Sequence, residues 1–424
     1  MRILFIHRDF PGIFRPLAQC FGSMPDTTTL FLSERGGKSL KLPGVRRLRI
    51  APTDLPAAGA GDAGESIMSV VLRRGTRAAN AMLRLRRDGF SPDIVYYPAD
   101  GGYGFYARDL FPDALHAVRA DWFSTQGESH LFFTRGAARP PADFAAGRAR
   151  NLCRYNALGD CDLALTGSRW QWSQFPDFLR NRIGVIHDGV DSAFFSPDSS
   201  DCFPGLPPGA EILSFSCRGT DPSRGLVPFL RALPRVLNLR PGCRAIIMDT
   251  GKDSADSVRE AVRGAVPETM RSRVLLPDFT LTAYRTMLRT STLHIYLTAP
   301  DNLSAGLFEA MSCGTLTLGS DTPPVHEILR HGENGFLCDF WDHEAMAETA
   351  ARILDMAPRF TGLRETARGT ILKDYDLATQ TRRHIMLLLD ALELPGGRGR
   401  MFDCLLVDEF QDVNPAQYEL VRMW

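Results

Sequence analysis

Short apolar runs rich in β-favouring residues alternate with helix-length segments along the first 185 residues of this chain of 424. The runs fall at residues 2–7, 29–32, 94–97, 163–166 and 185–186. Such an alternation is typical of an open parallel sheet covered by helices on both faces. The first part of the chain therefore predicts one doubly wound α/β domain.

A second series of the same kind follows a connector. Its apolar runs fall at residues 211–215, 244–248, 274–276, 293–297 and 315–318. The connector between the two series is rich in Pro, Ser, Asp and Gly, which is a composition typical of loops. We therefore predict two Rossmann-like, doubly wound domains. The predicted divisions are an N-terminal domain at 1–190, a C-terminal domain at 191–375, a helix at 376–394, and a linker and tail at 395–424.

Composition excludes several classes of protein. The 49 basic residues balance 49 acidic ones, so the chain has no polyanion-binding signature, and we expect no nucleic-acid partner. The nine cysteines are scattered without a C-x-x-C pair, which predicts a reducing compartment and no metal site. The apolar run Ile3–Ile6 is far shorter than a signal peptide core. These features favour the cytoplasm.

Basic charge is concentrated locally near the N-terminus. Residues 66–88 carry six arginines and one acidic residue, Asp88, with an apolar face that includes Val71 and Met82. This pattern predicts a helix docked on the first sheet. Its basic side is either solvated or in peripheral contact with anionic lipid head groups at the inner face of the membrane.

A loop of small residues leaves the strand at 293–297 and enters a predicted helix that carries Glu309. Backbone amides at a helix N-terminus suit a diphosphate, and a carboxylate further along the helix can hold ribose hydroxyls. The candidate donor-binding positions of this segment are Ser304, Ala305, Gly306, Leu307 and Glu309.

The same segment resembles the hallmark of glycosyltransferase family 4. That hallmark is two acidic residues separated by seven others, followed by Ala-Met and a glycine. Glu309-Ala-Met-Ser-Cys-Gly314 fits it, while Asp301 stands where the family usually has Glu, and Asn302 and Ser304 replace its usual glycines. The resemblance implies that Glu309 holds the ribose and that Asp301 contacts the sugar.

Three further segments resemble the same family. In Ser216-Cys-Arg218-Gly-Thr-Asp-Pro-Ser-Arg224-Gly225, the two arginines resemble the family's phosphate clamp of Arg and Lys. Arginine keeps the charge and can bind phosphate oxygens bidentately. Arg218 and Arg224 would thus neutralise a leaving diphosphate, so no metal and no separate cofactor is expected. Near the N-terminus, Gly12 in Arg8-Asp-Phe-Pro-Gly12 resembles a loop glycine that lets the backbone approach donor and acceptor.

Between the two series, His187-Asp-Gly-Val-Asp191 resembles the family's crossing turn, for which we expect a structural use. The resemblance extends over about residues 1–394. It implies a GT-B fold, in which the two Rossmann-like domains face each other across a cleft. The first domain would bind the acceptor, the second would bind the nucleotide-sugar, and the last helix would cross back to the first. It also implies transfer with retention, in the synthesis of cell-surface polysaccharide or glycoconjugates. The sugar, base and acceptor are left open, as is the oligomeric state.

Residues 401–424 have a different character. Met401-Phe-Asp-Cys-Leu-Leu-Val-Asp408-Glu409 resembles the second motif of UvrD-like superfamily 1 helicases, in which an apolar strand ends in Asp-Glu. A phosphate loop with its Lys and Ser/Thr is missing from the chain, so we interpret the tail as an orphan fragment.

Three alternatives to transfer remain at this point. One is a nucleotide-sugar epimerase of similar architecture, which would need no acceptor. The second is a degenerate sugar-nucleotide-binding protein, suggested by the altered residues 301–304. The third is a helicase fragment, which DNA-stimulated ATP hydrolysis would reveal.

Overall fold

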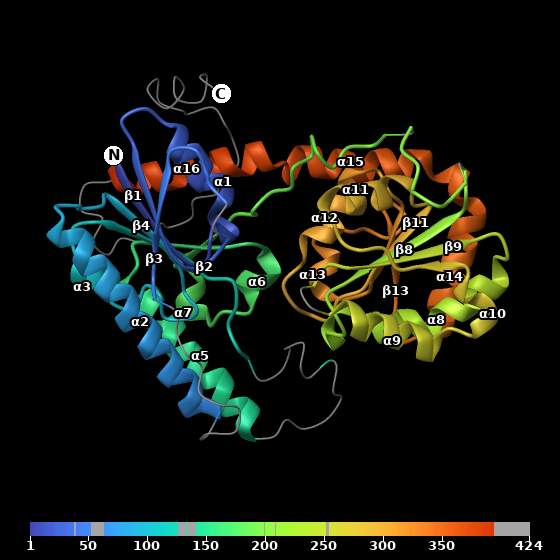
Figure 1. Cartoon of the computed structure of the whole chain (residues 1–424), viewed down its shortest axis with the longest axis horizontal. Helices are drawn as coiled ribbons and strands as arrows, with labels where there is room; N and C mark the ends of the chain where they lie inside the picture. Colours follow the sequence, from blue (N-terminus) through green and yellow to red (C-terminus); the bar gives the residue numbers. More distant parts are fainter. Residues whose placement is uncertain are drawn as a thin grey trace. The chain divides into compact units, whose positions relative to one another are not determined.

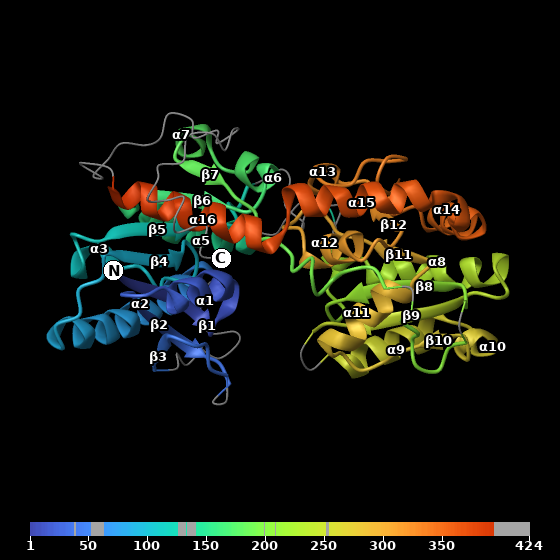
Figure 2. The same ribbon diagram turned by 90° about the horizontal axis from the view of Figure 1, so that it is seen from above.

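The structure, a computed structural model, describes residues 1–37, 40–51, 63–125, 133, 141–198, 200–207, 209–251 and 254–393. Contacts divide the chain into two compact units (Figures 1 and 2). Among the described residues, unit 1 comprises those within 1–125, 141–188 and 378–393, and unit 2 comprises Phe133 and those within 189–377. None of the helices in these described ranges is long and apolar enough to cross a membrane.

Unit 1 is built on a sheet of seven strands in the order β3-β2-β1-β4-β5-β6-β7, and every pairing is parallel. The strands are β1 (Arg2–Asp9), β2 (Thr28–Arg35), β3 (Val45–Arg49), β4 (Ile94–Pro98), β5 (Leu115–Arg119), β6 (Leu163–Thr166) and β7 (Ile183–Val185). The central strand β1 is buried on both faces, which explains its continuous apolar run. In register, Phe5 of β1 lies beside Phe31 and Tyr96.

Helices cover both faces of this sheet (Figure 1). They are α1 (Arg15–Ser23), α2 (Ala63–Arg87), α3 (Ala107–Leu110), α5 (Pro141–Asp160), α6 (Arg169–Ser173), α7 (Asp177–Arg180) and α16 (Leu377–Glu393). One apolar core includes residues of α2, α3 and α5, and the core on the opposite face includes residues of α1 and α16. The last helix is fixed there by a buried hydrogen bond between Tyr96 Oη and His384 Nε2, 2.7 Å long.

Unit 2 repeats this plan with a parallel sheet of six strands in the order β10-β9-β8-β11-β12-β13. The strands are β8 (Ile212–Cys217), β9 (Arg244–Asp249), β10 (Val274–Leu275), β11 (Leu293–Tyr296), β12 (Thr317–Ser320) and β13 (Phe336–Cys338). Its helices are α8 (Leu226–Leu239), α9 (Ala255–Ala265), α10 (Glu268–Arg271), α11 (Leu281–Thr290), α12 (Ala305–Ser312), α13 (Pro323–His326), α14 (His343–Met356) and α15 (Thr361–Asp374). Residues of α8, α9 and α14 form the core on one face, and residues of α11, α12 and α15 form it on the other.

Both doubly wound sheets predicted from the sequence are confirmed. Three strands were missed. Strand β3 is a partly exposed edge strand with three arginines, and β13 is a short edge strand, so neither presents an apolar run. Strand β5 includes His116, whose Nε2 lies 2.9 Å from the Phe111 carbonyl oxygen. Polar groups that find partners inside the core are invisible in a hydropathy pattern.

The segments at the limits of unit 2 lie side by side. Val190 and Asp376 form an isolated parallel bridge, and the Leu377 amide donates to the Val190 carbonyl over 2.9 Å. Gly189 has a φ of 79°, and a Cβ there would lie 2.6 Å from the Leu377 Cα. Only glycine fits this close approach. The His187–Asp191 turn therefore has the structural use expected for its glycine.

Candidate functional site

The carboxyl ends of β8 and β11 in unit 2 bring together the loops that carry the predicted donor site. Because β8 and β11 are adjacent and parallel, the loops that follow them meet at the same edge of the sheet. The Ala299 amide donates to the Ser223 carbonyl oxygen over 2.8 Å, which joins the two loops. Gly225, at a φ of 71°, makes this packing feasible, since a Cβ there would lie 2.3 Å from Leu297 Cβ.

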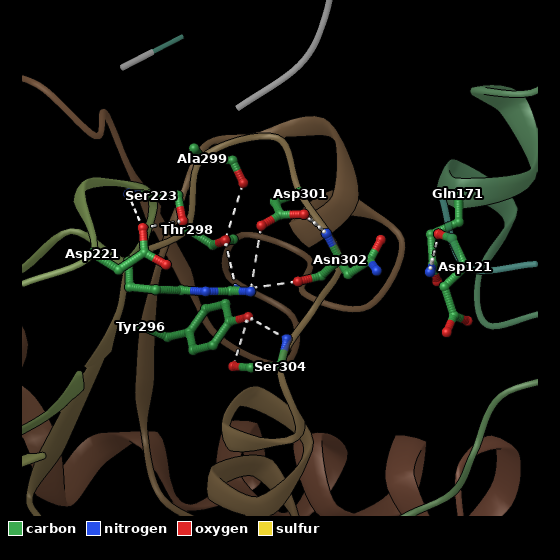
Figure 3. Close-up of polar contacts among 11 residues, drawn as sticks. Asp121, Gln171, Asp221, Ser223, Tyr296, Thr298, Ala299, Asp301, Asn302 and Ser304 are labelled. Atoms are coloured by element: carbon green, nitrogen blue, oxygen red, sulfur yellow. Dashed lines mark hydrogen bonds and ion pairs between the residues drawn. The ribbon is translucent and has the colours of Figure 1, made fainter. Parts of the chain in front are cut away.

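Arg224 of the β8 loop is held by the β11 loop. Its Nη1 donates to Thr298 Oγ1 at 3.2 Å and to the Asn302 carbonyl oxygen at 3.1 Å. Its Nη2 lies 3.4 Å from Asp301 Oδ2, and both side chains of this pair are less than one-fifth exposed. Figure 3 shows these acceptors converging on one guanidinium group. Two residues predicted from separate motifs, Arg224 and Asp301, thus form an ion pair.

The Asp301 carboxylate has a second partner, the Asn302 amide, which donates to Oδ1 over 2.7 Å. The carboxylate is therefore engaged within its own loop and by Arg224. Its predicted contact with a sugar stays a prediction.

Arg218, at the end of β8, differs from Arg224. Its side chain is exposed, and across the described ranges its guanidinium has no hydrogen-bond or ion-pair partner. The turn around it is fixed by its backbone instead: the next amide, that of Gly219, donates to Asp249 Oδ1 over 2.8 Å. The turn thus presents a positive charge at the strand ends that no other residue in the described ranges pairs with.

The N-terminus of α12 lies in the same unit, directly after the β11 loop. Ser304 occupies the N-cap position, but its side chain does not cap the first amides of the helix. Its backbone amide donates to Tyr296 Oη at 3.0 Å, and its hydroxyl lies 3.2 Å from the same oxygen. The first amides of α12, those of Ala305, Gly306 and Leu307, therefore keep the anion-binding capacity of a helix N-terminus.

Glu309 lies one turn further along α12. Burial raises the pKa of its carboxyl group to about 7, and a side-chain hydrogen bond with Tyr284 of α11 acts in the opposite direction. The carboxylate is thus partly buried and has one hydroxyl donor, which leaves acceptor capacity for other hydroxyl groups.

Sequence reasoning found the two arginines, Asp301 and the α12 positions because they lie in continuous motifs. It missed Thr298, Tyr296 and Tyr284. Thr298 directly follows a strand, which was an available signal, since side chains at the carboxyl ends of parallel strands line such sites. Tyr284 gave no signal, because its contact with Glu309 depends on how two helices pack.

Gly12, the predicted site residue of unit 1, is in the loop after β1. It has a φ of 54°, and a Cβ would lie 2.4 Å from His7 Nδ1, so glycine is required for the turn. Its predicted approach to the donor stays a prediction.

A pocket in unit 1 lies nearby, between the residues that follow Gly12 and helix α16. It is lined by Ile13, Pro16, Arg119, Asp188 and His384, among others. Arg119 is only 4% exposed in its side chain and pairs with Asp121 at 2.6 Å and with Asp188 at 3.1 Å. The charges of this pocket are therefore compensated within the unit.

Comparisons with known proteins agree with this geometry. Residues 25–195 match the model of the "Glycosyl transferase family 4 group", and residues 210–356 match that of the "Glycosyl transferases group 1". The two matched ranges correspond to the bulk of units 1 and 2. The helicase-like residues 401–424 lie outside both matched ranges and outside the described residues, and nothing in the comparisons supports that resemblance.

Individual relatives are distant. The chain is 28% identical over 279 residues to D-inositol 3-phosphate glycosyltransferase of Mycolicibacterium smegmatis, which covers 63% of this chain and 60% of that protein. It covers smaller shares of two other curated relatives. Among solved structures, Anabaena HepE in complex with UDP-glucose has a TM-score of 0.68 at 16% identity, over 92% of this chain and 100% of that one. Sucrose-phosphate synthase from Thermosynechococcus elongatus has a TM-score of 0.71 at 15% identity, over 92% and 98%.

These solved structures share the fold of two Rossmann-like domains, and the family models account for both units of this chain. The chain belongs to the group 1 glycosyltransferases of family 4, with a GT-B fold.

Proposed function

We propose that this chain is a glycosyltransferase that moves a sugar from a nucleotide-diphosphate sugar to an acceptor hydroxyl with retention of configuration. The observation that carries the proposal is the edge of the unit 2 sheet. Adjacent elements bring four groups there: Arg218, which has no side-chain partner among the described residues, Arg224, which the β11 loop holds, the N-terminus of α12 without a side-chain cap, and the partly buried Glu309 carboxylate. Family membership and a neighbour that binds UDP-glucose support the same conclusion.

Each group has a chemical task in this proposal. Arg218 and Arg224 neutralise the diphosphate, whose negative charge grows as the bond to the sugar breaks. The amides at the start of α12 donate to phosphate oxygens. Glu309 accepts hydrogen bonds from the ribose. The acceptor hydroxyl attacks from the face that the diphosphate leaves, and its proton departs with the leaving group.

Asp301 has a task at the other end of the donor. In the proposal it contacts the transferred sugar with the acceptor capacity left on its carboxylate. Its ion pair with Arg224 does not block phosphate binding, because a guanidinium presents five N–H donors and the contacts with Thr298, Asn302 and Asp301 use three of them.

The remaining assignments complete the proposal. Unit 1 binds the acceptor, with Gly12 at the approach to the donor. Two arginines carry the leaving-group charge, so the reaction proceeds without a metal ion or further cofactor. The reaction takes place in the cytoplasm, in the synthesis of surface polysaccharide or glycoconjugates, with the basic side of α2 facing anionic lipid.

The experiment is a measurement of nucleoside diphosphate release with a panel of nucleotide sugars and acceptors, in the presence and absence of EDTA. Release that needs an acceptor and survives EDTA is the expected result. Interconversion of donor sugars without acceptor would instead indicate an epimerase, and binding without turnover a degenerate protein. Activity that vanishes on chelation and returns with Mn²⁺ or Mg²⁺ would contradict the role given to the arginines.

A further inference from the structure

Tyr284 of α11 is a buried tyrosine whose hydroxyl lies inside the proposed donor site. Its exposed fraction is 3%. Its ring packs against Phe195, with ring centroids 6.3 Å apart, and against Phe279, with centroids 5.9 Å apart. Aromatic contacts on both sides leave the ring little freedom, so the position of the hydroxyl is fixed by the core of unit 2.

The hydroxyl connects three elements of the site. It forms side-chain hydrogen bonds with Ser216 of β8 and with Glu309 of α12. A phenol has one hydrogen to donate, and an ionised carboxylate can only accept. Tyr284 therefore donates to Glu309 and accepts from the Ser216 hydroxyl. The hydrogen bonds therefore run from the Ser216 hydroxyl to the Tyr284 hydroxyl and from there to the Glu309 carboxylate.

Helix α12 is shaped for this contact. A Cβ on Gly306 would lie 3.0 Å from Tyr284 Oη, so the first turn of the helix comes close to the hydroxyl. Because residue 306 has no side chain, the Tyr284 hydroxyl can lie next to this turn and reach the Glu309 carboxylate. The backbone amides of the same turn are the proposed donors to the diphosphate.

We propose that Tyr284 is a positioning residue that holds the Glu309 carboxylate in the orientation that accepts the ribose hydroxyls of the donor nucleotide. This inference rests on the proposed function. A carboxylate on a free rotamer would lose rotational freedom on each binding event, whereas one fixed by a buried donor is pre-organised. Tyr284 itself does not touch the donor, so its effect passes through Glu309.

The hydrogen bond also acts on ionisation. Burial raises the pKa of Glu309, and the Tyr284 hydroxyl opposes that rise because it stabilises the charged form. Among the described residues, the other titratable group that interacts with Glu309 is Cys313, the C-cap residue of α12. Arg289 and Arg285 of α11 and Arg368 of α15 act on Cys313. Loss of the Tyr284 hydroxyl should thus raise the pKa of Glu309 and leave less carboxylate at neutral pH.

The test is nucleotide binding measured by calorimetry from pH 6 to pH 9, with UDP as the first probe and GDP and ADP in parallel. Tyr284→Phe removes the hydroxyl and keeps the ring. We expect about tenfold weaker binding or more at pH 7, the size of a lost hydrogen bond to a charged group, and a smaller loss at pH 9. The pH midpoint of binding should move upward. Tyr155→Phe is the matched control, because the Tyr155 ring also packs against two aromatic residues, Phe123 and Phe178, but belongs to unit 1, and this change should leave affinity and midpoint unchanged.

A second substitution tests the same hydrogen bond without removing it. Incorporation of 3-fluorotyrosine at position 284 makes the phenol a stronger hydrogen-bond donor and keeps the aromatic ring that packs against Phe195 and Phe279. The pH midpoint of binding should then move downward, opposite to the Tyr284→Phe shift. This variant keeps the inference testable if Tyr284→Phe does not fold.

Two outcomes separate this inference from the function on which it rests. If Glu309→Gln weakens nucleotide binding but both changes at position 284 leave affinity and pH midpoint at the parental values, Tyr284 is only a packing residue and the inference is wrong. If Glu309→Gln itself binds nucleotide like the parent, the ribose assignment of the proposed function fails first.

Discussion

The two sheets of this chain treat the arginines at their carboxyl ends differently. In unit 1, Arg119 is buried, pairs with Asp121 and Asp188, and also donates to the Ile186 carbonyl oxygen over 3.2 Å. In unit 2, Arg218 is exposed and has no side-chain partner across the described ranges. The strand-end arginine of unit 1 thus forms ion pairs within its own unit, whereas no described side chain pairs with Arg218 of unit 2.

The difference teaches where a ligand anion can bind. A charge already paired with two carboxylates gains little from a phosphate, because one favourable contact must replace another. An arginine that no described side chain pairs with loses no such contact when it binds a phosphate, so the full favourable free energy of the new contact contributes to binding. We therefore expect Arg119 to contribute to stability and Arg218 to contribute to anion binding, and substitutions can separate the two roles.

The largest effect should follow from Arg119→Ala. Removal of the guanidinium, which is 4% exposed, leaves Asp188 and Asp121 without their common partner and the Ile186 carbonyl oxygen without this donor. Breaking a buried pair costs about 3–5 kcal/mol, and we expect a loss near the lower end of that range because the two carboxylates are 50% and 32% exposed. Urea unfolding should show that loss, while Arg263→Ala, an exposed arginine of α9, should change the free energy of unfolding by less than about 0.5 kcal/mol. Equal stability of the two variants would show that the unit 1 pair is not structural.

Glu309→Gln should give the next largest effect, and it should be a gain. The folded-state pKa of Glu309, about 7, lies above its ordinary value of 4.5, so the folded chain holds a proton that the unfolded chain has released. The parent therefore loses stability as pH rises from about 4.5 to about 7 and carries the full penalty above that range. Glutamine removes the charge. We expect the variant to be more stable than the parent at pH 8, by on the order of 2 to 3 kcal/mol.

Urea unfolding of Glu309→Gln and parent at pH 5 and pH 8 measures this gain, with Glu365→Gln, an exposed residue of α15, as the control. The gain should be much smaller at pH 5. A stability difference independent of pH would mean that burial does not raise the pKa of Glu309. Ionisation of this carboxyl group would then not destabilise the folded chain.

Asp301→Ala should have the smallest effect on stability. Its ion pair with Arg224 is 3.4 Å long and partly solvated, and such pairs contribute about 0–1 kcal/mol. Since the change also frees Arg224, we expect nucleoside diphosphate binding to stay the same or become slightly tighter, while turnover falls because the sugar contact is lost. Calorimetry paired with initial rates measures both. A large loss of diphosphate affinity would instead give Asp301 a role in shaping the phosphate site.

Most of the fold could be predicted from the sequence, because buried parallel strands such as β1 and β11 are continuous apolar runs. The edge strand β3 could not be predicted, because its three arginines interrupt any apolar run. Within the site, Arg218, Arg224 and Glu309 lie in local motifs and were predicted. The side-chain contacts that hold Arg224 and Glu309 in place were not predicted. Neither the Arg224–Asp301 ion pair nor the Tyr284–Glu309 hydrogen bond follows from spacing, because each joins elements that meet only after the sheet has formed.

The most direct test of the central claim is the affinity of Arg218→Ala for a nucleoside diphosphate and for the corresponding nucleoside, with Arg263→Ala as the control. The account predicts at least about tenfold weaker binding of the diphosphate, an unchanged affinity for the nucleoside and an unchanged free energy of unfolding, since a lost charge-assisted hydrogen bond costs about 1.5–3 kcal/mol. If Arg218→Ala binds the diphosphate as tightly as Arg263→Ala does, the unpaired charge of unit 2 is not the anion site, and the assignment of the donor site to this edge is wrong.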